Sequence, residues 1–175
     1  MNWLSLISTL VALTFAGFVL YRYAYRGGAH LLLWGIGLVL YSLGTFAEFY
    51  LSLRWSPTWL HLWYIGGALL TAAWLGQGTV YLLVRKPAWL AHALMAVLAI
   101  GSVYAVWRTL ATPLDGRAFS AAVAVSAQYK QIMPPGGVRL LTIPFNIYGT
   151  LGLVGGAIYS AWLFWRKRVL PNRVI

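Results

Sequence analysis

The chain of 175 residues contains no cysteine. This absence excludes disulfides, thiolate nucleophiles, cysteine-ligated zinc sites and iron–sulfur clusters. It also leaves the redox compartment undetermined, because cysteine usage is the sequence signal that would indicate it.

Acidic side chains are almost absent as well. Glu48 and Asp115 are the only two carboxylates against 13 Lys and Arg, which gives a formal net charge of +11. No Ser/His/Asp arrangement, carboxylate pair, Walker-type glycine loop or His-x-Glu motif is present, so most hydrolytic mechanisms lack their groups. We therefore predict no catalytic residues, no metal site and no cofactor. The enzymatic alternative is a lipid-modifying enzyme.

The three histidines each fall near the start of an apolar run. His30 and His92 are predicted on one side of the membrane and His61 on the other. Axial haem ligands would be expected at mid-helix depth, where none of them lies. Interfacial histidines are the better interpretation.

The chain is rich in hydrophobic residues, at 61%, and only 9% of its residues are charged. This composition indicates an all-α integral membrane protein. The run after Trp3 lacks a basic n-region and a small-residue cleavage site, so we interpret it as a retained helix and not a signal peptide. The sequence predicts a single transmembrane domain, residues 1–175, forming a bundle of five spans. These helices are expected at about 3–21, 30–50, 59–84, 88–107 and 140–165.

The basic residues lie between the apolar runs, where they orient helices and meet anionic headgroups, so nucleic acid is not an expected partner. One side of the membrane collects Arg22, Arg26, Arg85, Lys86, Arg166, Lys167, Arg168 and Arg173. The other side has only Arg54 in its short loop. Its long loop, where charge matters less, adds Arg108, Arg117, Lys130 and Arg139. The positive-inside rule therefore predicts an external N-terminus and a cytoplasmic C-terminus, in a multi-pass protein of the inner (cytoplasmic) membrane.

The stretch 108–139 is predicted to be a long outer loop, which contains the turn sequence "PPGG". Residues 119–129 read "FSAAVAVSAQY", which is apolar but too short to span a membrane. They form either an interfacial helix or a packed loop. The final "LPNRVI" suggests that the chain is a shortened version of a longer bundle.

The second run carries an acidic residue in a polar stripe. At 3.6 residues per turn, Glu48 shares a helix face with Tyr41, Thr45 and Ser52, whereas the other faces are apolar. An intramembrane carboxylate costs about 2.5 to 3.5 kcal/mol, which the large apolar residues of the helix offset. The wheel therefore predicts that Glu48 faces the interior of the bundle.

Two other runs have similar stripes. Gln77 and Tyr81 lie on one face of the third run, which also includes Gly67, and Asn146 lies on the fifth. The candidates for ligand binding or proton coupling are therefore Glu48, Gln77, Asn146, Tyr41, Tyr81 and Thr45. Glycines of the fifth run are predicted to pack against another helix, namely Gly149, Gly152 and Gly156. The structural alternative is that the polar side chains hold helices together.

The stretch 41–83 contains "LGTFAEF" and then "WYIGGALLTAAWLGQGTVYLL". It resembles a helix pair in the seven-helix membrane sensor region of bacterial histidine kinases. The likeness is a glycine before an interior glutamate, followed by an aromatic-rich helix, and it covers about a quarter of the chain. Only five helices are expected here and no kinase domain follows, so the resemblance implies a sensor-like bundle without phosphotransfer.

These features predict a non-enzymatic polytopic membrane protein. It would be a ligand-binding, sensor-like or accessory subunit that works with membrane lipids and with another membrane protein or its own copy. The alternative is a small-solute or proton-coupled transporter or channel in which Glu48 contacts the solute or carries the proton.

Overall fold

The computed structural model describes residues 2–84 and 86–169, the last three by their backbone alone, and its regular elements are all helices. The long helices are α1 (Trp3–Arg26), α2 (Ala29–Leu51), α5 (Ala88–Leu110) and α7 (Gly137–Val169). The shorter ones are α3 (Pro57–Trp63), the π-helix η1 (Tyr64–Leu70), α4 (Thr71–Leu83), the 3₁₀ turn η2 (Gly116–Ala118) and α6 (Val125–Ile132). The C-terminal stretch "LPNRVI" lies outside the described residues.

Within the described residues, four helices are long and apolar enough to cross a membrane, namely Trp3–Arg26, Ala29–Leu51, Ala88–Leu110 and Gly137–Arg166. This supports an all-helical membrane protein. The predicted span 59–84 is built from α3, η1 and α4, which follow one another from Pro57 to Leu83 without a break. None of these three pieces has the length of a span by itself.

The long helices continue beyond their hydropathy limits. α1 includes both Arg22 and Arg26 and ends where Gly27 and Gly28 adopt φ values of 64° and 101°. Such positive φ values favour glycine, which has no Cβ to clash with the backbone. The helix therefore ends at these glycines and not at the preceding change in hydropathy.

The predicted outer loop 108–139 contains more regular structure than expected. α5 extends into it to Leu110, η2 and α6 lie within it, and α7 begins at Gly137. A helix does form near the apolar stretch 119–129, but it begins at Val125 and not at Phe119. Residues 119–124 are an irregular segment that precedes α6.

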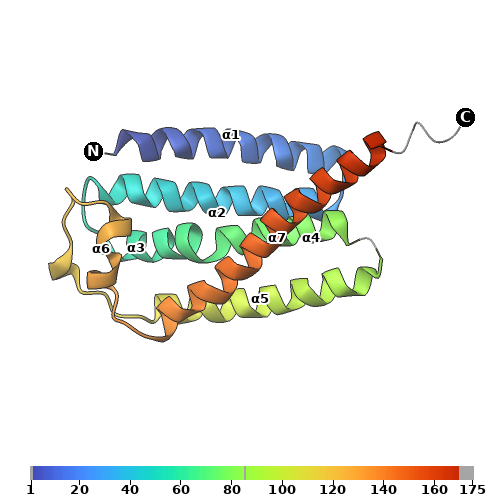
Figure 1. The fold of residues 1–175 in the computed structure, drawn as a ribbon. Coiled ribbons are helices and arrows are strands. Elements are labelled where there is room, and N and C mark those ends of the chain that lie inside the picture. The colour runs from blue at the N-terminus through green and yellow to red at the C-terminus, as the bar shows by residue number, and fades with distance from the viewer. Residues whose placement is uncertain (1, 85, 170–175) are drawn as a thin grey trace, which may run out of the picture.

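α1, α2 and the α3–α4 segment run side by side, and α7 crosses α4 obliquely (Figure 1). Glycines allow the closest approaches. A Cβ on Gly44 of α2 would lie 2.6 Å from the backbone nitrogen of Gly67 in η1. A Cβ on Gly149 of α7 would lie 2.3 Å from the carbonyl carbon of Ala72 in α4.

The predicted packing glycines of α7 thus lie against α4. A Cβ on Gly152 would be 2.9 Å from the Cα of Gly76, and one on Gly156 would be 2.3 Å from the Thr79 Cγ2 atom. At Gly152 the near atoms belong to the backbone of α4, so the two helices cannot separate to admit a side chain there without losing their contact.

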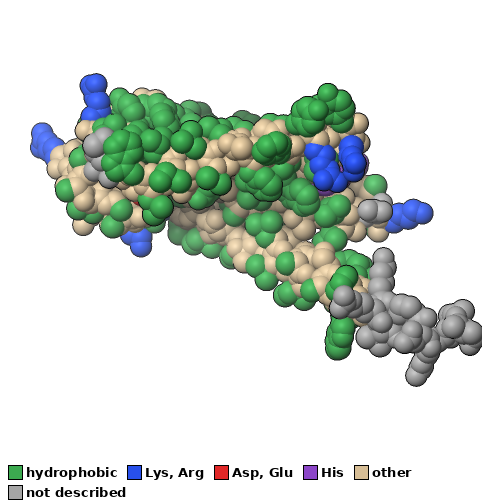
Figure 2. Space-filling model, turned by 90° about the horizontal axis from the view of Figure 1, so that it is seen from above, with side chains coloured by type: hydrophobic (Ala, Val, Ile, Leu, Met, Phe, Trp, Pro, Cys, Tyr) green, Lys and Arg blue, Asp and Glu red, His purple; other side chains and the backbone are tan. Residues whose placement is uncertain are grey.

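The largest buried cluster lies at the end of the bundle that carries α6. It joins α2, α3, η1, α6 and the start of α7, and its members include Leu51, Leu60, Tyr64, Ile132, Met133 and Val138. In the view of Figure 2, hydrophobic side chains cover most of the length of the molecule, whereas Lys and Arg gather toward its two ends. This distribution is typical of a protein whose middle contacts lipid.

Candidate functional site

A polar cavity of about 290 Å³ lies beside Glu48, where the N-terminus of α1 meets the C-terminal end of α2. Three polar side chains line it, those of Asn2, Glu48 and Ser52. The remaining wall is formed by the irregular segment before α6 and the first residue of that helix, residues 121–125.

Glu48 is half-buried and incompletely hydrogen-bonded. Trp63 Nε1 donates to its Oε2 atom over a long distance of 3.4 Å. Among the described residues, no Lys, Arg or His lies within ion-pair distance of this carboxylate. Since an ionised carboxylate has about four acceptor positions, Glu48 retains most of its hydrogen-bonding capacity.

The first residues of α1 shape one side of the cavity. The Asn2 side chain caps α1 by accepting from the backbone nitrogen of Ser5 at 3.4 Å. The Asn2 backbone nitrogen in turn donates to Ser52 Oγ at 3.1 Å. These contacts hold the start of α1 against the end of α2, so that both polar groups lie near Glu48.

Gln128 of α6 holds the segment that forms the remaining wall. Its side chain is 4% exposed. It accepts from the Ser120 backbone nitrogen at 2.8 Å and donates to the carbonyl oxygens of Ser120 and Val123 at 2.7 and 2.6 Å. Gln128 therefore positions the segment that leads into the cavity wall at residues 121–125.

The other polar residues of α2 have different surroundings. Thr45 Oγ1 and Thr9 Oγ1 of α1 are 2.8 Å apart and hydrogen-bonded. Tyr41 is 40% exposed and does not line the Glu48 cavity. α2 contacts both α1 and α4.

Gln77 is fully buried and lies apart from the Glu48 cavity. Its Nε2 donates to the Ala91 carbonyl of α5 at 2.9 Å, and its Oε1 accepts from the Tyr148 hydroxyl of α7. Both ends of the amide therefore have partners within the bundle. Gln77 links α4, α5 and α7.

Asn146 and Tyr81 also make contacts between helices. Asn146 Nδ2 donates to the Ala68 carbonyl of η1 at 3.0 Å. The Tyr81 hydroxyl and His92 Nδ1 are hydrogen-bonded at 2.9 Å between α4 and α5. The structure thus does not bring Gln77, Asn146 and Tyr81 together with Glu48.

The other two histidines are also engaged separately. His61 Nε2 is 3.1 Å from the Thr112 carbonyl, and His30 packs edge-on against Trp34. Within the described residues, no group of three His, Asp or Glu side chains is placed to hold a metal ion.

Sequence reasoning missed Asn2, Gln128 and the segment 121–125. Asn2 immediately precedes an apolar run, which is the position of a helix N-cap and was a usable signal. Gln128 gave no such signal, because its partners in the loop depend on the folded path of the chain.

The cavity presents the hydrogen-bond acceptors of Glu48, with an amide and a hydroxyl group nearby. Comparisons of the chain with protein-family models, curated proteins and solved structures found no match.

Proposed function

We propose that this chain is a non-enzymatic binding subunit of a membrane, which takes a small ligand bearing hydrogen-bond donors beside Glu48. The observation that carries the proposal is a half-buried carboxylate with one long hydrogen bond, in the wall of a polar cavity. A donor-bearing ligand would bond to the Glu48 oxygen for which the protein supplies no partner.

The proposal includes five membrane spans. The continuous helical segment from Pro57 to Leu83 would be the fifth, since its 27 residues measure about 40 Å against a hydrocarbon core of about 30 Å. The interruption of α-helical geometry by η1 is compatible with a span, because the segment remains helical throughout. The bundle then crosses the membrane an odd number of times.

The proposed orientation has the N-terminus outside and the C-terminus in the cytoplasm. The ends of α1 and α4, the start of α5 and the end of α7 lie toward one end of the molecule (Figure 1). That end receives most of the Lys and Arg outside the long 108–139 segment, which favours the cytoplasmic side. The Glu48 cavity would then open toward the outside of a cytoplasmic membrane.

A binding role is the function that we rank first, in line with the resemblance to sensor bundles. A site near the external surface is reached by solutes without their crossing the membrane. The subunit would pass its occupied state to another membrane protein or to a second copy of itself.

Transport is our second candidate. A solute or proton path from Glu48 would require further polar groups through the bundle. Gln77, a polar candidate that lies apart from the Glu48 cavity, has both ends of its amide engaged by Ala91 and Tyr148. These contacts favour binding over transport.

Native mass spectrometry tests the proposal on protein extracted gently from its own membrane. Wild-type protein should carry a reproducible small-molecule mass, and Glu48→Gln should lose it because the amide cannot replace a charged acceptor. The matched control is Asp115→Asn, which changes the other carboxylate outside the cavity and should retain the added mass. Wild-type protein without an added small-molecule mass, or equal amounts of that mass on wild type and Glu48→Gln, would overturn the proposal.

A further inference from the structure

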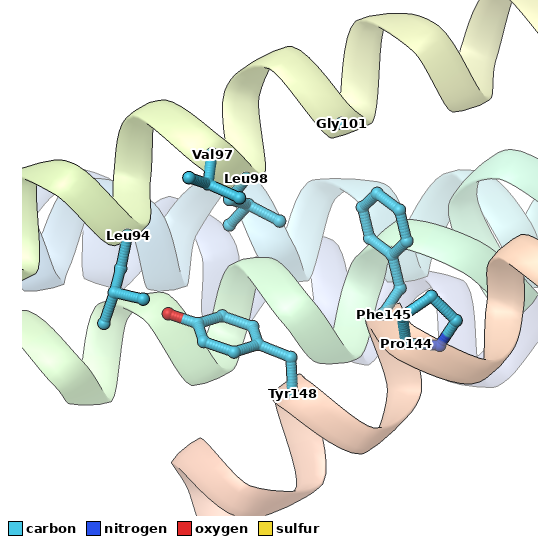
Figure 3. A pocket seen from close by; sticks show the side chains of 7 residues that line it. All are labelled: Leu94, Val97, Leu98, Gly101, Pro144, Phe145 and Tyr148. Carbon is cyan, nitrogen blue, oxygen red and sulfur yellow. The ribbon is translucent and has the colours of Figure 1, made fainter.

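A second cavity of about 260 Å³ lies between α5 and α7, away from Glu48. Leu94, Val97, Leu98 and Gly101 of α5 face Pro144, Phe145 and Tyr148 of α7 across it (Figure 3). The Tyr148 hydroxyl is its main polar group, and it is already bonded to Gln77. The cavity therefore offers its occupant an apolar surface.

This cavity is a groove that opens at the side of the bundle. Leu98 on its floor is 7% exposed, whereas Val97 at its edge is 70% exposed. α5 and α7 are both apolar enough to cross a membrane. The groove thus faces the acyl chains of the surrounding lipid.

A cation lies on the same side of α5 as the groove. Arg108 follows Gly101 by seven residues, which is about two turns, so both lie on one face of the helix. A Cβ built on Gly137, the first residue of α7, would be 3.9 Å from Arg108 Nη2. The guanidinium group therefore lies where the end of α5 meets the start of α7.

Arg108 has no acidic partner among the described residues. Its guanidinium carbon is 6.0 Å from the centroid of the Trp107 ring, and that Trp is 61% exposed. The remainder of the outer segment adds Arg117, Lys130 and Arg139 against Asp115 alone. A guanidinium group binds a phosphate through paired hydrogen bonds, and this excess of positive charge favours an anionic headgroup.

The depth of the groove matches one leaflet of a bilayer. Leu98 precedes Arg108 by ten residues, or about 15 Å along the helix. Half of the hydrocarbon core is also about 15 Å. A phospholipid with its phosphate at Arg108 would thus place the end of an acyl chain beside Leu98.

We infer that the α5–α7 groove is a binding site for an anionic phospholipid, with the phosphate held by Arg108 and an acyl chain between the two helices. The site is independent of the ligand proposed at Glu48. An anionic lipid bound there would join α5 to α7 along a stretch where protein side chains leave a gap.

The test measures lipid retained by purified protein after exposure to equal amounts of dioleoyl phosphatidylglycerol and dioleoyl phosphatidylcholine, by native mass spectrometry. Wild type should retain the anionic lipid preferentially. Arg108→Gln should lower its retention about fivefold, the change expected for losing one cation near a headgroup. Arg54→Gln, which removes an exposed Arg at the same end of the bundle, should retain it normally.

A second pair of variants tests the acyl-chain position. Val97→Trp places a large ring in the groove and should reduce retention, whereas Val103→Trp changes a residue of α5 that is 73% exposed and lies outside the groove. Both changes add the same side chain to one lipid-facing helix. Equal retention of the two lipids by wild type, normal retention in Arg108→Gln, or equal effects of the two Trp variants would overturn the inference.

Discussion

Glu48 and Gln77 occupy similar positions in the sequence, yet their surroundings in the structure are different. Each is a polar residue in an apolar helix, with glycine close by. Gln77 is fully buried with partners at both ends of its amide, whereas Glu48 is half-buried with one long hydrogen bond. We call the surroundings of Gln77 the closed region, because both ends of its amide have partners. We call the surroundings of Glu48 the open region, because its carboxylate retains free acceptor positions.

The difference teaches that the unmet hydrogen-bonding capacity of a polar residue indicates a ligand site better than its presence in a helix does. A buried group with all its partners stabilises the contact between helices. A group with free acceptor positions next to a cavity is available to a ligand. The closed region should therefore respond to mutation through stability, and the open region through binding.

The largest expected effect is on the closed region, from Gly149→Val. The added side chain would meet the backbone of Ala72, which cannot move aside. We expect a loss of about 3 kcal/mol or more in the free energy of unfolding, at or above the upper range for overpacking. Denaturation in detergent, followed by circular dichroism, measures it.

Gly155→Val is the control for that change. It adds the same side chain to the same helix, where a Cβ would meet no atom within 4 Å. Comparable destabilisation by the two variants would mean that the cost arises from valine in α7 and not from the crossing with α4.

The next largest effect is expected for Gln77→Leu, which removes the hydrogen bonds to Ala91 and Tyr148. Leaving buried groups without partners should lower the free energy of unfolding by about 1 to 3 kcal/mol. Ligand occupancy of the Glu48 cavity should not change. The double variant Gln77→Leu/Tyr148→Phe should lose less free energy of unfolding than the two single variants together, because both changes remove the same Gln77–Tyr148 hydrogen bond. Additive losses would show that Gln77 and Tyr148 are not coupled.

A smaller effect is expected at the wall of the open region. Gln128→Ala removes three hydrogen bonds to Ser120 and Val123, so amide hydrogen exchange in residues 120–124 should accelerate and ligand retention should fall. Gln131→Ala alters an exposed residue of the same helix and should leave both unchanged. Unaltered exchange in Gln128→Ala would exclude a positioning role.

The smallest effect on stability is expected for Glu48→Gln. The amide keeps the size of the side chain and can still accept from Trp63, so the free energy of unfolding should change by less than about 0.5 kcal/mol, as at surface positions. The measurement is unfolding of protein from which the ligand has been removed. A loss of unfolding free energy comparable to that of Gln77→Leu would show that Glu48 also has a structural role. It would contradict the difference drawn between the open and closed regions.

Hydropathy was sufficient to predict much of the fold. Apolar runs indicated an all-helical membrane protein, and α2 was placed within one residue at each end. The end of α1 was missed because helix formation continues past Arg22 until Gly27 and Gly28 change the backbone. Hydropathy measures preference for lipid, whereas a helix ends where its backbone geometry ends.

The candidate site was less predictable. The helical wheel of α2 drew attention to Glu48 but placed Tyr41 on the same face. The sequence of a single helix does not reveal which of its faces neighbouring helices cover. The wheel of the third run also placed Gly67 on the same face as Gln77, yet Gly67 lies against α2 and Gln77 bonds to α5 and α7. The wall at residues 121–125 was not identified, since its position depends on contacts distant in sequence.

The π-helical segment η1 has a consequence for every residue that follows it. A π-turn accommodates one more residue than an α-turn, and one residue corresponds to about 100° of rotation around a helix axis. The side-chain hydroxyl of Thr71, Oγ1, donates to the Gly66 carbonyl oxygen of η1 at 2.5 Å. Deleting one residue from η1 to restore a plain α-helix would rotate all of α4 by about 100°, turning Gln77 away from Tyr148 and Gly76 away from Gly149. The rotation of α4 about its own axis is thus set by one extra residue in η1. The packing of α7 against α4 depends on that rotation.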